Sequence, residues 1–544
     1  MTSSASKDLR SQVAELIVVR ASGHCSDRER RYPQWELSNS ELKALLRDGI
    51  GGVILLGGSC TELWHRCNTL KNWAVQPLLL CADVEEGVGQ RFDGGTWLVP
   101  PLALGLLYKT DQERAITLAE HYGRCTGHEA QACGLNWVLA PVCDVNNNPA
   151  NPVINVRAWG EDPSTVSALA CAFHRGLKET GVLGCAKHFP GHGDTTVDSH
   201  LDLPVLDHSL ERLEQLELKP FEALIKDDIA SVMTAHLLMK SLDSQQPATL
   251  SSHVIKQLLR NQLGYNGLVV TDALVMEAIT KRYDPAEAAV QAFCAGSDLI
   301  LMPADANAAI DGLCHAIQSG RIPLEDVKNS QQRRRLALKK LNQITSNEKH
   351  QQLQPFQRDE DYLVMKEMVT ATIKVYRPHS ITAKGGGVNL IRTDGVLPSS
   401  VLTSQSAALT MPTAVRFEPL ICHHHGISPW QDDPKEPLAL ERLPNGPVLL
   451  QLFIRGNPFN GNRADQEPWG AAIQQLQRRR RLAGLVIYGS PYVWDVLVKL
   501  VEPHIPTAFS PAQTLEAQTQ MMHLMLEPKG INSTERPINQ GFTD

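Results

Sequence analysis

Short apolar runs recur along the N-terminal part of the chain, each bounded by glycine, proline or asparagine and each followed by a segment of helical pattern. This alternation predicts a parallel sheet whose strands are joined by crossover helices. Because there are eight runs, we expect a (β/α)8 barrel of the TIM type. A doubly wound open sheet is the alternative, although no GxGxxG motif follows the first run. The runs are Ala14–Arg20, Gly52–Gly57, Pro77–Val84, Asn136–Val145, Val182–His188, Ile229–Leu237, Gly267–Asp272 and Ser297–Met302.

A chain of 544 residues is longer than a single hydrophobic core supports, so we expect further domains. A polar, glutamine-rich stretch follows the barrel, and beyond it short strand-like and helical patterns alternate again. These patterns predict a smaller α/β sandwich with a polar tail that is typical of disorder. The predicted organisation is a barrel over residues 1–344, a linker over 345–366, a C-terminal α/β domain over 367–528 and a tail over 529–544.

The charge pattern argues against two kinds of partner. The formal net charge is −7, and both signs are scattered, so no basic stripe is present that could bind nucleic acid or a membrane surface.

The first ten residues lack the apolar stretch of a secretory signal, which leads us to expect a cytoplasmic protein. Several of the twelve cysteines lie in apolar runs, as reduced and buried thiols do. The tract Cys422-His423-His424-His425 is the one metal-like sequence, and a polar turn explains it equally well.

Polar and charged residues crowd the carboxyl ends of the predicted strands, where the loops of a barrel converge on one mouth. The densest loop leaves the fifth strand and carries Lys187, His188, His192, Asp198 and His200. Asp198 lies two residues before His200, so its carboxylate can orient the imidazole for proton transfer. The alternatives are a solvent loop with incidental charges and a metal site built from the three histidines.

Residues after two other predicted strands have both a chemical and a structural interpretation. Asp272 ends the apolar seventh strand, where a nucleophile or a helix N-cap is equally expected. Asp83 and Arg91 follow the third strand, where they can bind sugar hydroxyls or form a structural ion pair.

Three segments together resemble glycoside hydrolase family 3, in its bacterial β-N-acetylglucosaminidase branch. The first is the loop Lys187–Thr195 with Asp198-Ser199-His200. The second runs from Ala140-Pro141-Val142 to Arg157-Ala158-Trp159-Gly160, and the third is the strand Gly267–Asp272. The resemblance covers the whole predicted barrel, and it departs from the branch at Glu86, in the turn before Arg91, and at Ala273, beside Asp272.

The resemblance implies a retaining exo-β-N-acetylglucosaminidase that needs no metal or cofactor and acts on β-linked N-acetylglucosamine, with cell-wall fragments as the expected substrate. It implies that Asp272 is the nucleophile and that His200, held by Asp198, is the proton donor. The residues that it implies for sugar binding are Asp83, Arg91, Arg157, Lys187 and His188.

Three other functions stay open from the sequence. A β-glucosidase or β-xylosidase of the same family differs in the sugar, and a phosphorylase would use phosphate in place of water. A non-catalytic sugar-binding protein is the third. The oligomeric state is not predicted.

Overall fold

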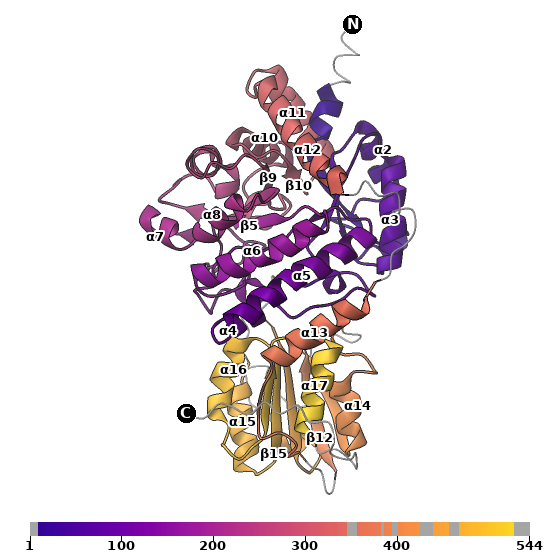
Figure 1. Ribbon diagram of the computed structural model, residues 1–544, viewed down its shortest axis with the longest axis vertical. Coiled ribbons are helices and arrows are strands. Elements are labelled where there is room, and N and C mark those ends of the chain that lie inside the picture. Colours follow the sequence, from indigo (N-terminus) through magenta and orange to yellow (C-terminus); the bar gives the residue numbers. More distant parts are fainter. Residues whose placement is uncertain are drawn as a thin grey trace. The chain divides into compact units, whose positions relative to one another are not determined.

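The computed structural model describes residues 9–344, 356–381, 386–393, 401–423, 439–455 and 467–526. They belong to two compact units (Figure 1). The first comprises Met1–Thr372 with Arg455–Arg463, and the second comprises Ile373–Ile454 with Ala464–Asp544.

Eight parallel strands form the barrel of the first unit, which confirms the predicted fold class and all eight predicted strands. One arc has the order β10-β1-β2-β3-β4 and the other the order β5-β7-β9. Parallel bridges at Trp137–Leu183 and Val270–Leu299 join the arcs at both ends, so the barrel closes. The strands are β1 (Ile17–Ser22), β2 (Gly52–Leu56), β3 (Leu79–Ala82), β4 (Trp137–Val138), β5 (Cys185–Phe189), β7 (Ser231–Thr234), β9 (Leu268–Thr271) and β10 (Ile300–Leu301).

These strands are mostly apolar because both of their faces are covered. Arg20 in β1 and the Lys187-His188 pair in β5 are exceptions. Every residue of β3, β7 and β9 is buried. The register of β7 against β9 runs without interruption from Ser231 opposite Leu268 to Thr234 opposite Thr271. Consequently the residues that follow adjacent strands emerge at the same end of the barrel.

Helices alternate with the strands, as the sequence predicts. Asp111 and Asp162 cap the N-termini of α5 and α6 through their carboxylates. The pattern of Ser209–Lys226 predicts one continuous helix, and this prediction is wrong. Leu216 leaves the helical conformation, and Pro220 lies at the start of a second helix. The helices and helical turns of the first unit are α2 (Asn39–Asp48), α3 (Cys60–Trp73), α4 (Pro101–Tyr108), α5 (Gln112–Ala132), α6 (Pro163–Glu179), α7 (Leu210–Gln215), α8 (Lys219–Lys226), η5 (His253–Gln262), α9 (Glu277–Thr280), α10 (Pro285–Ala295), α11 (Ala306–Gln318), α12 (Leu324–Ile344) and α13 (Asp359–Thr372).

The second unit is a sheet of order β11-β16-β15-β14-β12-β13, parallel except for β11. Alternate residues of β14 face two separate hydrophobic clusters, with Leu450 in one and Leu449 in the other. Helices α15 and α16 supply the first cluster, and α14 and α17 supply the second, so the expected sandwich is present. Its elements are β11 (Lys374–Tyr376), β12 (Gly387–Thr393), α14 (Ala407–Ala414), β13 (Phe417–His423), β14 (Val448–Ile454), α15 (Trp469–Arg478), β15 (Leu482–Gly489), α16 (Pro491–Leu497), β16 (Thr507–Ser510) and α17 (Leu515–Met525).

Some predicted segments fall on undescribed residues. Residues 345–355 of the predicted linker and the predicted tail lie outside the described residues, whereas the end of the linker belongs to α13. His424 and His425 of the histidine tract also lie outside them, and the Cys422 side chain is buried. Within the described ranges, no helix has the length and apolarity needed to cross a membrane.

Candidate active site at the carboxyl ends of the barrel strands

Asp272 directly follows β9, and its carboxylate lies among imidazole rings at the mouth of the barrel. Burial raises the pKa of Asp272, but nearby imidazoles and the backbone N–H of Ala273 outweigh burial and lower that pKa to about 2. The N–H of Ala273 donates to Asp272 Oδ1 at 2.7 Å. The next helix, α9, begins only at Glu277, so Asp272 is not a helix N-cap. The imidazoles are those of His236, His188 and His200.

Asp198 and His200 form a carboxylate–imidazole pair in the loop that follows β5. His200 Nδ1 lies 2.8 Å from Asp198 Oδ1, and the same oxygen accepts the backbone N–H of His200 at 2.8 Å. The Asp198 side chain is 5% exposed and the His200 side chain is 24% exposed. His200 is therefore partly accessible, and it lies close enough to Asp272 to lower the pKa of that carboxylate.

Four charged side chains form a second cluster at the mouth, contributed by the ends of two strands, β3 and β5, and by one loop. Lys187 Nζ lies 2.8 Å from Asp83 Oδ1 and 2.6 Å from Glu85 Oε1. Arg157 donates from Nε and Nη2 to the two oxygens of Glu85, each at 2.8 Å. Burial raises the pKa of Glu85, but Arg157 and Lys187 hold it well below its usual range. The side chain of Asp83 is 37% exposed, so its carboxylate is accessible to a ligand.

His188 is oriented by the buried carboxylate of Asp144. The ring Nδ1 of His188 lies 2.7 Å from Asp144 Oδ2, and the backbone N–H groups of His188 and His192 also donate to Asp144. Burial raises the pKa of Asp144, but His188 and these hydrogen bonds lower it. One carboxylate thus fixes the ring of His188 and the backbone of the loop that begins beside it.

Asp144, Glu85 and His236 received no role from the sequence, although each lies at a strand end. His236 Nδ1 lies 2.9 Å from Thr249 Oγ1, and His236 Nε2 lies 3.0 Å from the carbonyl oxygen of Ala273. In the sequence, these residues stand out only by their position after apolar runs. Their contacts could not be predicted, because their partners are remote in sequence.

Arg91 lies at the edge of the charged cluster. Its Nε donates to the backbone carbonyl of Asp83 at 3.0 Å, and its side chain is exposed. Glu86 is buried and accepts from Trp97 Nε1 at 2.9 Å and from Arg455 Nη1 at 2.7 Å, all within the first unit. A buried carboxylate with two donors explains why a glutamate is accommodated at position 86.

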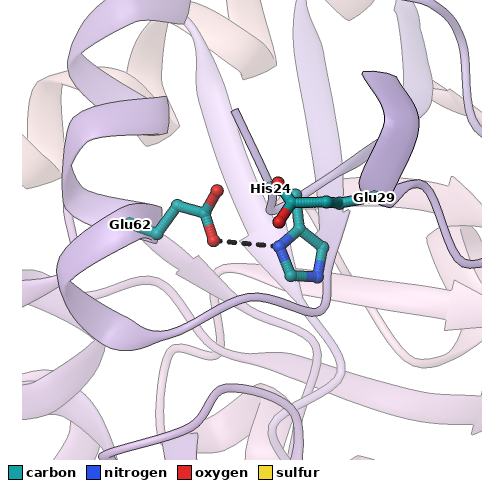
Figure 2. Close-up of side chains that lie close together, drawn as sticks. All are labelled: His24, Glu29 and Glu62. Carbon is teal, nitrogen blue, oxygen red and sulfur yellow. Dashed lines mark hydrogen bonds and ion pairs between the residues drawn. The ribbon is translucent and has the colours of Figure 1, made fainter. Parts of the chain in front are cut away.

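The three loop histidines do not assemble as a metal site. Both ring nitrogens of His192 engage hydroxyl groups, and His188 Nδ1 engages Asp144. A different group, His24, Glu29 and Glu62, brings its ligand atoms within 4.8 Å of one another (Figure 2). His24 Nδ1 lies 2.9 Å from Glu62 Oε2, and this ion pair accounts for the approach of these two side chains.

The site combines an ionised carboxylate at a strand end with an imidazole that is held by a second carboxylate. These groups are typical of a (β/α)8-barrel enzyme with acid/base and nucleophilic chemistry. Comparison with known proteins narrows this class. The profile described as "Glycosyl hydrolase family 3 N terminal domain" matches residues 8–336, and "Bacterial Glycosyl hydrolase family 3 C-terminal domain" matches residues 380–527. The chain belongs to glycosyl hydrolase family 3.

Named relatives and solved structures agree with this assignment. "Beta-hexosaminidase A" of Pseudoalteromonas piscicida is 37% identical over 286 residues, which cover 48% of this chain and 47% of that protein. "Beta-hexosaminidase" of Idiomarina loihiensis is 35% identical over 282 residues, covering 51% of this chain and 84% of the relative. The structure of a family 3 β-N-acetylglucosaminidase from Paenibacillus sp. is 27% identical and covers 95% of this chain and 97% of its own, with a TM-score of 0.77.

Proposed function

We propose that the protein is a retaining exo-β-N-acetylglucosaminidase that removes terminal N-acetylglucosamine from β-linked glycosides. The observation that carries the proposal is the Asp198–His200 pair, whose imidazole lies close enough to Asp272 to lower the pKa of that carboxylate. The names of the relatives, beta-hexosaminidase and β-N-acetylglucosaminidase, agree with this activity.

In the first step, a carboxylate oxygen of Asp272 attacks the anomeric carbon from below the ring. The bond from that carbon to the bridging oxygen breaks, and protonated His200 transfers its Nε2 proton to the departing oxygen. Asp198 stabilises the imidazolium and keeps Nδ1 turned away from the substrate. The product is a covalent glycosyl-enzyme.

In the second step, neutral His200 accepts a proton from water, and the water oxygen attacks the same carbon. The bond to Asp272 breaks, and the carboxylate is regenerated. Two inversions leave the configuration of the sugar unchanged. His200 is protonated again, so the cycle closes without an external proton.

The charged cluster is suited to hold the sugar. Asp83 offers accessible acceptor oxygens, and Lys187 supplies ammonium donors beside them. His188 is fixed by Asp144 and presents its second ring nitrogen. We assign these three residues, with Arg157 and Arg91, to binding of the sugar hydroxyls. Charge-assisted hydrogen bonds of this kind contribute about 1.5–3 kcal/mol each.

Phosphate is the second candidate for the acceptor in the second step. A neutral imidazole repels an anion less than a carboxylate base does. A site whose base is His200, held by Asp198, therefore admits phosphate more readily than the usual site with two carboxylates. Free sugar as the sole product at millimolar phosphate would exclude it. Cell-wall fragments as the natural substrate, and a cytoplasmic location, stay predictions.

Comparison of three chromogenic substrates tests the proposed activity. We expect hydrolysis of p-nitrophenyl N-acetyl-β-glucosaminide and much slower hydrolysis of the matching glucoside and xyloside. Faster turnover of the glucoside would assign the protein to another activity of its family. Absence of turnover on all three substrates, with the protein folded, would refute the proposal.

A further inference from the structure

We propose that His192 and Ser199 form a latch that holds the Asp198–His200 pair in its working position, which makes them positioning residues. The inference deepens the proposed function and rests on it. His192 touches neither Asp198 nor His200 through the hydrogen bonds of its ring, so it acts on them through the chain of the loop.

The imidazole of His192 joins two points of the loop that carries the pair. Its Nε2 lies 2.9 Å from Ser199 Oγ, and its Nδ1 lies 2.8 Å from Thr195 Oγ1. The side chains of His192, Thr195 and Ser199 are all buried. Because burial lowers the pKa of His192 to about 4, the ring is neutral near pH 7, with one nitrogen donating and the other accepting.

The base of the loop is held independently of the latch. Asn151 Nδ2 donates to the carbonyl oxygens of His192 and Gly193, each at 2.9 Å. A Cβ atom at Gly193 would lie 1.7 Å from the carbonyl oxygen of Val145, so the backbone packs closely there. His192 is therefore a fixed point from which its ring reaches the more distant Ser199.

Ser199 lies between the two residues whose position matters. His200 on one side is 24% exposed, and the next residue, Leu201, is 44% exposed, whereas Ser199 itself is 2% exposed. The backbone N–H groups of Leu201 and Asp202 both donate to the carbonyl oxygen of Asp198, which makes a tight turn around Ser199. The hydrogen bond between Ser199 Oγ and His192 thus holds this turn on its buried side, while His200 and Leu201 stay accessible.

Loss of the latch would displace an acid without removing it. A displaced acid slows the step in which a poor leaving group needs a proton, whereas a good leaving group departs without one. The dependence of kcat/KM on the leaving group, which reports formation of the glycosyl-enzyme, separates this effect from general damage to the fold.

Ser199→Ala tests the latch with two substrates, phenyl and 2,4-dinitrophenyl N-acetyl-β-glucosaminide. We expect kcat/KM to fall about 10- to 100-fold on the phenyl substrate and less than about threefold on the dinitrophenyl substrate. Thr195→Val, which leaves the Ser199 bond intact, is expected to have a smaller effect of the same kind. Ser199→Thr retains the hydroxyl and should restore most of the activity on the phenyl substrate.

Ser330→Ala is the matched control, since Ser330 Oγ is buried and donates to Asp298 at 2.8 Å, before β10 at the opposite end of the barrel. It should affect both substrates equally. Equal losses on both substrates for Ser199→Ala, or no loss on either, would overturn the latch while leaving the proposed function intact. A wild-type protein inactive on both substrates would instead refute the proposed function itself.

Discussion

At the scale of single residues, the site depends on opposing effects of burial and charge. Asp272 stays ionised because neighbouring imidazoles and one backbone N–H offset burial, and Glu85 stays ionised because Arg157 and Lys187 do the same. An aspartate side chain acts as a nucleophile only when it is ionised, so the low pKa of Asp272 keeps it competent for that role across the physiological pH range.

Replacement of Asp272 by asparagine removes the attacking charge and leaves the shape almost unchanged. We expect Asp272→Asn to lower kcat by about 10³-fold or more, with the far-ultraviolet circular dichroism spectrum retained. Asp284→Asn is the control, because Asp284 is an N-cap carboxylate on α10. Comparable activity of the two variants would exclude Asp272 as nucleophile.

We expect Lys187 to contribute both to binding of the sugar and to stability of the folded protein. Lys187→Met leaves Asp83 without its cation and Glu85 with Arg157 alone, so we expect a loss of about 3–5 kcal/mol in the free energy of unfolding and a raised KM. Lys178 pairs with Asp228 at the surface, so Lys178→Met should cost less than about 1 kcal/mol. Urea titrations of both variants measure the difference; equal costs would contradict a buried role for Lys187.

The sequence was informative for residues with a local signature and not for those with remote partners. Asp198 and His200 are two positions apart, and their pairing follows from the sequence. Glu85 meets Arg157 across 72 positions, and Asp144 meets His188 across 44, so only the closed barrel brings them together. Their place at strand ends was visible, but their roles were not.

At the scale of elements, the close crossing of α5 and α6 depends on two glycines. A Cβ at Gly123 would lie 1.9 Å from the carbonyl oxygen of Phe173, and a Cβ at Gly176 would lie 1.9 Å from that of Glu120. In the chain, α5 precedes β4 and α6 precedes β5.

Alanine at either position should destabilise the protein although it favours an isolated helix by about 1 kcal/mol. We expect Gly123→Ala and Gly176→Ala each to cost about 1–3 kcal/mol, because backbone atoms must move apart. In α15, Gly470→Ala would meet a leucine side-chain atom at 3.0 Å, which can shift, and it serves as the control. Thermal unfolding that ranks Gly470→Ala as the most damaging would contradict this account.

Elements were predictable where apolar patterning was strong. The eight barrel strands lie in mostly apolar runs, whereas β13 contains Pro419 and Glu418 and was not predicted. Helix α14 contains Pro412, and its helical start carries no side-chain cap, so it too lacked a signal. Tertiary packing, rather than local preference, determines these two elements.

At the scale of the whole molecule, buried neutral histidines make stability depend on pH. His174 and His192 are buried, and burial lowers the pKa of each from 6.5 to about 4. The unfolded chain takes up protons below about pH 6.5 that the folded state does not bind, so stability present at pH 7 is lost as pH falls.

Between pH 7 and pH 5.5, each of these histidines should lower the free energy of unfolding by about 1 kcal/mol. Most carboxyl groups stay ionised in this interval, so the change belongs mainly to histidines. Urea unfolding followed by tryptophan fluorescence at the two pH values measures it. Greater stability at pH 5.5 than at pH 7 would show that these rings are not buried in neutral form.

The central claim is that Asp272 forms a covalent bond to the sugar. A fluorinated N-acetylglucosamine analogue that slows the second step, followed by proteolysis and mass measurement, locates the labelled residue. The account predicts a single label on the peptide that contains Asp272. A label on another carboxylate, or turnover of the analogue with no adduct at any time, would contradict it.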